Sequence, residues 1–231
     1  MKHSIKLLLL AVAAVATAAS CMKKSTSRYY EADIAVIQEN YFLQDIGTKM
    51  IPSNGWKDTW GQHGDRVFLT YYYDAYDFNS ETNSLPIEVD EVAKIQTEYR
   101  ALPHSSADTV GTASFLLREG EFNTSAWNIP DFLTVQFFFY YSNDSSKSHT
   151  FGFVEDDPLF RNDTLNLRFW HKTNETTKTN VVRNFVSLRL DSYKHYLNQS
   201  DTAFVSIKYL EENTSGGTVS EKKISAKYYK P

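Results

Sequence analysis

Short runs in which apolar and polar residues alternate limit what this chain can fold into more than any other feature of its 231 residues. Successive side chains of a β-strand point to opposite faces, so a period of two is typical of half-buried strands. The clearest runs span 66–73, 133–140, 165–170, 186–191, 205–209 and 224–229. Clusters of turn-forming residues separate them, such as Ser-Asn-Asp-Ser-Ser at 142–146. The pattern predicts an all-β protein of antiparallel strands, with a β-sandwich in its second half.

The first half of the chain contains less regular candidates for strands. Short apolar runs indicate strands at 34–36, 41–46 and 48–51. The stretch 85–99 fits two structures, because Val89, Val92, Ile95 and Tyr99 also form the stripe of an amphipathic helix. Residues 103–112 (PHSSADTVGT) have the strongest turn and linker composition in this part of the sequence. We therefore expect one domain over 32–102, a linker over 103–112 and a second domain over 113–231.

The N-terminal segment has the composition of a secretory signal. Basic residues Lys2 and Lys6 precede an apolar run at 7–16 that is too short to span a bilayer. Small residues then lead to Cys21, the only cysteine of the chain. This arrangement resembles a bacterial lipobox, after which the cysteine is acylated and becomes the first residue of the mature protein. The alternative is an ordinary cleaved signal peptide. We expect a lipoprotein signal peptide over 1–20 and a lipidated tether over 21–31, with Cys21 as the lipidation site.

The tether indicates where such a protein resides. Acyl chains hold a protein at a membrane firmly when two or more are attached. Lys23, Lys24 and Arg28 suit an anionic headgroup surface, and the tether lacks the acidic patch that sends some lipoproteins to the cell exterior. We therefore expect a cell-envelope protein, anchored to the outer membrane and facing the periplasm. Loss of Lys2 and Lys6 with the signal changes the formal net charge from −4 to −6.

The succession of segments resembles the NigD-like lipoproteins of Gram-negative anaerobes. The resemblance rests on YFLQDIGTKMIPSN (41–54), HGDRVFLTYYYD (63–74), IEVDEVAKI (87–95), LNLRFWHKTNETT (165–177) and NFVSLRLDSY (184–193). It implies an N-terminal small barrel of the OB type followed by a C-terminal Ig-like antiparallel β-sandwich. It also implies that 85–99 is mostly strand. The family takes its name from a bacteriocin operon, which implies an accessory or immunity-type role, and it offers no catalytic residues to transfer.

No motif in the sequence carries a recognisable reaction. A G-x-S-x-G elbow, an H-E-x-x-H helix and phosphate-binding glycine loops are absent, and the histidines are scattered. The acidic run Glu155-Asp156-Asp157 is interpreted as turn chemistry rather than as a calcium site. We expect no enzyme activity, no metal and no cofactor, with a periplasmic hydrolase as the least favoured alternative. An OB-type barrel raises nucleic acid as a partner, but the net charge of −6 and the envelope location argue against it.

The loop at 53–64 is the best candidate for a ligand-binding surface. It holds Trp56 and Trp60 among three glycines, with few apolar neighbours of its own. Such rings stack on a sugar or anchor a protein interface when exposed, and they cap a core when they fold back. The sequence therefore favours a non-enzymatic binding module for an unknown envelope protein. The alternative is a glycan-binding lipoprotein that uses Trp56 and Trp60.

Overall fold

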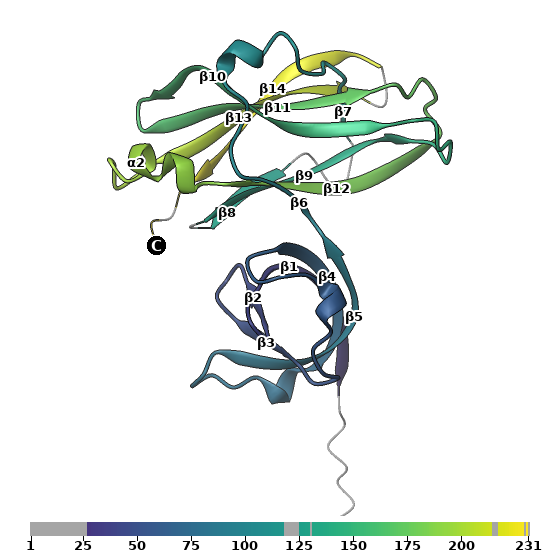
Figure 1. The fold of residues 1–231 in the computed structure, drawn as a ribbon, viewed down its shortest axis with the longest axis vertical. Helices are drawn as coiled ribbons and strands as arrows, with labels where there is room; N and C mark the ends of the chain where they lie inside the picture. Colours follow the sequence, from purple (N-terminus) through teal and green to yellow (C-terminus); the bar gives the residue numbers. More distant parts are fainter. Residues whose placement is uncertain (1–26, 118–124, 130, 214–216, 229, 231) are drawn as a thin grey trace, which may run out of the picture.

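The computed structural model describes residues 27–117, 125–129, 131–213, 217–228 and 230. These residues form two bodies, a barrel near the start of the chain and a two-layered sandwich above it in Figure 1. The sandwich presents one of its two sheets toward the barrel. The expected all-β fold, a small closed barrel followed by a β-sandwich, is confirmed.

Five strands close the barrel. They are β1 (Arg28–Ile37), β2 (Phe42–Gln44), β3 (Lys49–Pro52), β4 (Arg66–Asp74) and β5 (Ser84–Lys94). Their order around the barrel is β1-β2-β3-β5-β4, and β1 pairs with β4 to complete it. This five-stranded closed arrangement is that of the OB type. Two short 3-10 helices lie in its loops, η1 (Asp58–Trp60) and η2 (Ala75–Asp77).

Alternation along the strands fills the barrel. In β5, Leu85, Ile87 and Val89 are buried, while the alternating acids Glu88 and Asp90 are exposed. This period of two selects the strand over the helix in 85–99, and the predicted strand is confirmed by β5 and by β6 (Gln96–Glu98). The barrel core consists of ten buried residues: Ala35, Ile37, Phe42, Met50, Val67, Leu69, Tyr71, Leu85, Ile87 and Val89.

The sandwich packs a sheet of five strands on one of four. The first holds β10 (His149–Arg161), β11 (Thr164–Thr173), β13 (Phe204–Asn213), β14 (Val219–Lys227) and β7 (Phe115–Leu117). The second holds β6, β12 (Asn180–Arg189), β9 (Phe132–Tyr141) and β8 (Ser125–Ile129). Most neighbours are antiparallel, but β11–β13, β13–β7 and β12–β6 are parallel. The parallel pair β11–β13 arises because β12, which lies between them in sequence, belongs to the opposite sheet.

Phenylalanines dominate the space between the two sheets. Phe115 stacks on Phe169 with ring centroids 4.7 Å apart, and Phe137 meets both Phe115 and Phe151. Aromatic pairs of this kind stabilise a core beyond the area they bury. Short helices close one end of the sandwich, η4 (Asp191–Tyr193) and α2 (Lys194–Leu197), and η3 (His104–Ser106) lies beside β10.

The acidic run Glu155-Asp156-Asp157 is not a turn. It lies inside β10, at a bulge where the pairing with β11 shifts between Glu155 and Phe160. Asp156 is buried beside Lys208, whose Nζ lies 2.6 Å from its carboxylate, and Arg168 lies 3.7 Å away. Opposite charges from other strands replace the water that a turn would have provided. The turn interpretation was therefore wrong.

The chain passes from barrel to sandwich near Ile95. β5 ends at Lys94, and β6 pairs with β12 of the sandwich although it lies within the range expected for the barrel, 32–102. Farther on, Leu102 forms a parallel bridge with Val154. The division into separate domains with a linker at 103–112 stays a prediction.

Candidate functional site

The two tryptophans predicted as binding residues pack on the core of the barrel. Trp56 and Trp60 are half-buried and pack against the barrel core. Their ring centroids lie 5.2 and 5.5 Å from that of Phe42 and 5.3 Å from each other, in an edge-to-face pair. The structure therefore places both rings as caps of the core, with part of each surface open to solvent. Their use by a ligand stays a prediction.

The backbone of the loop after Trp60 requires glycine. Gly61 has a φ of 138°, in the region that side chains rarely adopt. A Cβ there would lie 2.9 Å from Asp65 Oδ2 and 3.0 Å from Ile37 Cδ1. Asp65 in turn accepts a hydrogen bond of 2.9 Å from the backbone N–H of Gln62. The loop is thus held against the barrel by its own backbone rather than projecting from it.

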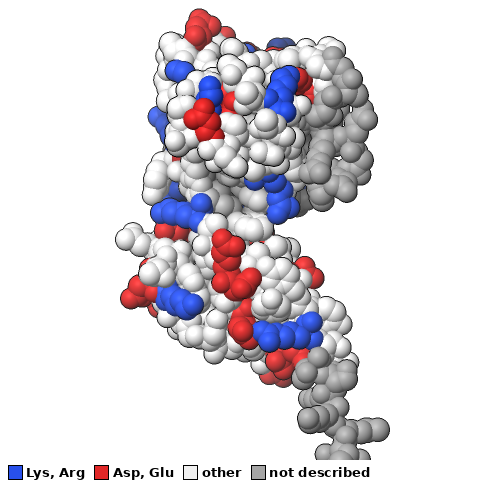
Figure 2. All heavy atoms as spheres, turned by 90° about the vertical axis from the view of Figure 1, so that its right-hand side faces the viewer, with Lys and Arg blue, Asp and Glu red and all other residues white. Residues whose placement is uncertain are grey.

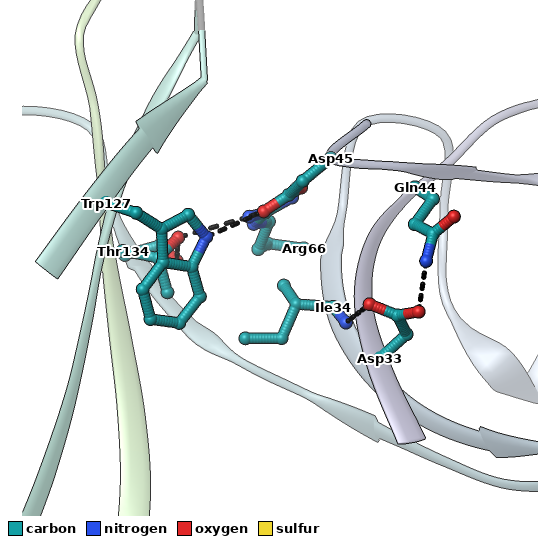
Figure 3. Close-up of polar contacts among 8 residues, drawn as sticks. Asp33, Ile34, Gln44, Asp45, Arg66, Trp127 and Thr134 are labelled. Atoms are coloured by element: carbon teal, nitrogen blue, oxygen red, sulfur yellow. Dashed lines mark hydrogen bonds and ion pairs between the residues drawn. The ribbon is translucent and has the colours of Figure 1, made fainter. Parts of the chain in front are cut away.

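A buried arginine joins the barrel to the sandwich (Figure 3). Arg66 at the start of β4 is fully buried, and both terminal nitrogens of its guanidinium donate to the carboxylate of Asp45. From the sandwich, Trp127 Nε1 donates to the same carboxylate at 2.8 Å, and Thr134 Oγ1 accepts from Arg66 at 3.2 Å. A bidentate pair between arginine and a carboxylate adds geometric specificity as well as electrostatic stabilisation.

Apolar packing surrounds this ion pair at the same junction. Phe68 of the barrel stacks on Phe185 of β12 with centroids 5.4 Å apart, and Arg183 lies over both rings. Thr134 also shares a hydrogen bond of 3.0 Å with Ser187, which continues the polar chain into the sheet. Polar and apolar contacts from several strands therefore hold the two bodies in one orientation.

A groove of about 400 Å³ lies along the junction. Its walls come from the barrel, from the crossing segment and from the sandwich: Gly64, Asp65, Arg66, Lys94, Ile95, Gln96, Thr97, Tyr99 and Arg189. Tyr99 is 76% exposed, and the guanidinium of Arg189 lies 5.7 Å from its ring centroid. On the face drawn in Figure 2, basic side chains flank the waist between the two bodies. Clefts at domain junctions are common ligand sites.

Two groups of the sandwich have strongly shifted pKa values. Burial raises the pKa of Glu98, in β6, to about 7, although its carboxylate accepts a hydrogen bond of 3.0 Å from the N–H of Phe153. In the sandwich, burial lowers the pKa of His171 to about 4. His171 Nε2 lies 3.1 Å from Nδ1 of His149, and its Nδ1 lies 3.3 Å from the carbonyl of Ser114. Within the described residues, no cluster of three or more histidine, cysteine or acidic side chains is arranged to hold a metal ion.

Sequence reasoning found the tryptophan loop and missed the junction. Asp45 and Arg66 lie 21 residues apart, and Trp127 lies 82 residues from Asp45, so only the fold brings them together. The sequence did contain one indication of the junction: Tyr99 and Arg100, residue types common in protein interfaces, follow a predicted strand just before the expected linker. The predicted lipidation site Cys21 lies outside the described residues.

Comparison with known proteins identifies the second body. Residues 122–220 match the model of the NigD-like C-terminal beta sandwich domain. Over these residues the second body is similar to a NigD-like β-sandwich domain. The expected resemblance to NigD-like proteins is therefore confirmed. No curated protein matches the chain.

Solved structures share the arrangement of barrel and sandwich. A "Putative lipoprotein" from Bacteroides fragilis has a TM-score of 0.68 at 13% identity, over 87% of this chain and 99% of that one. A NigD-like immunity protein from Bacteroides caccae has a TM-score of 0.61 at 20% identity, over 85% and 92% of the two chains. A protein of unknown function from Bacteroides vulgatus has a TM-score of 0.60 at 18% identity, over 87% and 92%. These likenesses establish the fold.

The described residues contain no helix that is both long and apolar enough to cross a membrane.

Proposed function

We propose that this NigD-like protein is a lipid-anchored binding protein of the cell envelope that captures a protein partner in the junction groove. The observation that carries the proposal is the exposed Tyr99 beside Arg189, in a groove built from both bodies. Tyrosine and arginine are enriched among residues that dominate protein interfaces. The buried Arg66–Asp45 pair holds the walls of the groove in place before a partner arrives.

The immunity-type role extends this proposal. The similar structure from Bacteroides caccae is a NigD-like immunity protein, and we take the role in that name to be the binding of a protein antagonist. We propose the same class of action here, without catalysis. The lipid anchor is Cys21, which holds the protein at the outer membrane with the folded bodies in the periplasm. The resemblance to the Bacteroides fragilis structure supports an envelope location.

The test compares partner capture by tyrosine variants. Tagged protein is cross-linked in intact envelopes, and captured proteins are quantified by mass spectrometry for the wild type and for Tyr99→Ala. Truncation of an interface anchor costs about 2 kcal/mol or more, so we expect capture of the specific partner to fall by at least about tenfold. Tyr141→Ala is the matched control, because Tyr141 is also an exposed tyrosine of the sandwich but does not line the groove. Equal capture by Tyr99→Ala and Tyr141→Ala would show that the groove is not the site.

Glycan binding through the tryptophan loop is the second proposal. Trp56 and Trp60 keep part of their surface open, and Lys57 Nζ lies 5.6 Å from the ring centroid of Trp60. A glycan array probed with the wild type and with Trp56→Ala tests it. Binding that Trp56→Ala abolishes and Tyr99→Ala leaves unchanged would replace the protein-partner proposal with this one.

A further inference from the structure

An unusual surface lies on the side of the barrel farthest from the sandwich. Both η2 and the beginning of β1 are on that side (Figure 1). Four large side chains there are exposed, with fractions of 74% for Tyr76, 53% for Tyr30 and 46% each for Tyr29 and Phe78. We define these four, together with Tyr72 and Tyr73, as the aromatic face.

The pairing of β1 with β4 brings two pairs of these rings to the same rim of the barrel, one pair on each face of the two strands, because successive side chains alternate. In the register of these strands Tyr29 lies opposite Tyr73 and Tyr30 opposite Tyr72. Ring centroids are 5.5 Å apart in the first pair and 4.8 Å in the second. Arg28, the first residue of β1, lies opposite Asp74, the last residue of β4. Because η2 begins directly after Asp74, Tyr76 lies close to the start of β1.

Polar groups set the chemistry of the aromatic face. A shallow cleft of about 320 Å³ opens beside Tyr72 and Tyr73, with the carboxylates of Asp74, Asp77 and Glu88 in its walls. Arg28 occupies one part of the cleft, where its guanidinium lies 4.4 Å from the ring centroid of Tyr72 and pairs with Glu88. Rings with adjacent carboxylates are the usual surroundings of a bound ammonium group.

The length of the tether decides what meets this face. Arg28 is seven positions after the proposed anchor Cys21, so the start of β1 stays within about 25 Å of the acylated residue even if the tether is fully extended. Tyrosine is favoured at bilayer interfaces, where its apolar ring and its polar hydroxyl are both accommodated. The exposed rings are thus the part of the barrel that the anchor holds nearest to lipid.

We infer that the aromatic face rests on the membrane that carries the anchor, with ammonium headgroups of phosphatidylethanolamine against the rings and carboxylates. The inference depends on the acylation of Cys21, which is part of the proposed function. In this arrangement the sandwich and the junction groove face away from the bilayer. The groove therefore stays accessible to a partner in the periplasm.

The test measures the distance of single positions from the bilayer. The acylated full-length protein is reconstituted in vesicles of phosphatidylethanolamine and phosphatidylcholine that contain nitroxide-labelled lipid. Because Cys21 is the only cysteine, its acylation leaves one thiol in Tyr76→Cys for a fluorescent label. The matched control is Ile46→Cys. Ile46 is 79% exposed on the same barrel, next to Asp45, which contacts the sandwich.

We expect the label at position 76 to be quenched several-fold more strongly than the label at position 46. Replacement of phosphatidylethanolamine by phosphatidylglycerol should reduce the quenching at position 76, because the surrounding carboxylates repel that headgroup. Equal quenching at both positions in floating vesicles would overturn the inference and leave the anchor intact. If the acylated wild type does not float with vesicles while Cys21→Ala behaves identically, the anchor itself is wrong, and the inference fails with it. Quenching that grows with phosphatidylglycerol would overturn the headgroup assignment.

Discussion

Arg66 shows how a single residue joins the two bodies. Its guanidinium has no exposed surface, so its charge depends on Asp45 in place of water. Such a pair gains little over apolar residues of the same size, but the loss of one partner leaves a buried charge without compensation. A substitution that breaks this pair is therefore expected to lower stability much more than a substitution that breaks a surface ion pair.

We expect Asp45→Asn to lower the free energy of unfolding by about 3 kcal/mol. The amide keeps the shape of the side chain and an acceptor for Trp127, but it removes the negative charge that faces Arg66. Urea denaturation followed by circular dichroism measures the change. The control is Lys94→Met, which breaks a pair between Asp65 and a lysine whose side chain is 63% exposed, and which should cost no more than about 0.5 kcal/mol. Equal losses in the two variants would contradict the junction role of Asp45.

Glu98 predicts a pH dependence of stability. Its folded pKa of about 7 lies above the ordinary value of 4.5, so the folded protein binds the proton more tightly than the unfolded chain does. The protonated side chain therefore stabilises the fold below pH 4.5, and this contribution is lost as the pH rises through about 7. Glu98→Gln does not titrate and keeps an acceptor for the N–H of Phe153. We expect the variant to be more stable than the wild type at pH 8, by about 1–3 kcal/mol, and close to it at pH 4.5.

His171 contributes a pH dependence of the opposite sign. Its folded pKa of about 4 lies below the ordinary 6.5, so its contribution is complete above pH 6.5 and is lost as the pH falls through about 4. In the wild type the effects of Glu98 and His171 oppose each other between pH 4.5 and 6.5. Glu98→Gln should therefore reveal a steeper loss of stability in acid. Denaturation midpoints of both proteins from pH 4.5 to 8 check this, and parallel curves would contradict the shift at Glu98.

At the scale of elements, the tryptophan loop is expected to act as a lid on the barrel. Trp56 and Trp60 both contact Phe42, which is fully buried. Replacing a fully buried tryptophan by alanine lowers the free energy of unfolding by about 3–5 kcal/mol, so we expect a loss of about 1–3 kcal/mol for each of these half-buried rings. Urea denaturation of Trp56→Ala and Trp60→Ala measures this, with Ile46→Ala as the exposed control. A loss below about 0.5 kcal/mol for either ring would free it for a ligand.

Alternation predicted most of the strands because most of them have one face in a core and one in solvent. It failed at β10, where the residues from Phe151 to Asp156 are buried in succession. No period remains in such a stretch, and its acids resemble a turn. Their partners come from distant elements, since Glu155 accepts from Tyr193 at 3.1 Å and Asp156 pairs with Lys208. That these residues lie close together in the fold cannot be predicted from the sequence.

The candidate sites, too, could be predicted from the sequence only in part. The loop with Trp56 and Trp60 could be found because its residues are contiguous, although their packing on Phe42 could not. The junction groove could not be found, because it depends on the angle between barrel and sandwich. That angle is set by contacts such as Phe68 on Phe185, which are 117 positions apart in the printed sequence.

At the scale of the whole molecule, the crossing segment belongs to both bodies. Barrel strand β5 runs into β6, and the backbone after β6 continues along β10. The two bodies therefore share the backbone near Ile95 as well as the contacts around Arg66. A partner held in the groove would contact residues of both bodies and would stabilise their relative orientation.

We expect the sandwich to begin at β6 and not after the linker. A fragment over 95–231 keeps β6 and Ala101, whereas a fragment over 111–231 begins near the expected domain boundary and loses them. The shorter fragment leaves the N–H of Phe153 without Glu98 and the carbonyl of Phe151 without the amide of Gln96. It also removes the N–H of Ala101 from the hydroxyl of Tyr193, a contact of 3.2 Å, although that hydroxyl keeps its bond to Glu155.

Each buried polar group left without a partner costs about 1–3 kcal/mol, and a domain of this size has a total stability of only about 5–15 kcal/mol. We therefore expect 95–231 to unfold cooperatively in urea and 111–231 to be unfolded or soluble only as an expanded state. Circular dichroism and amide hydrogen exchange distinguish the two. Fragments of equal stability would place the start of the sandwich after residue 110 and would make β6 an accessory of the barrel, because its pairing with β12 would then add nothing to the sandwich.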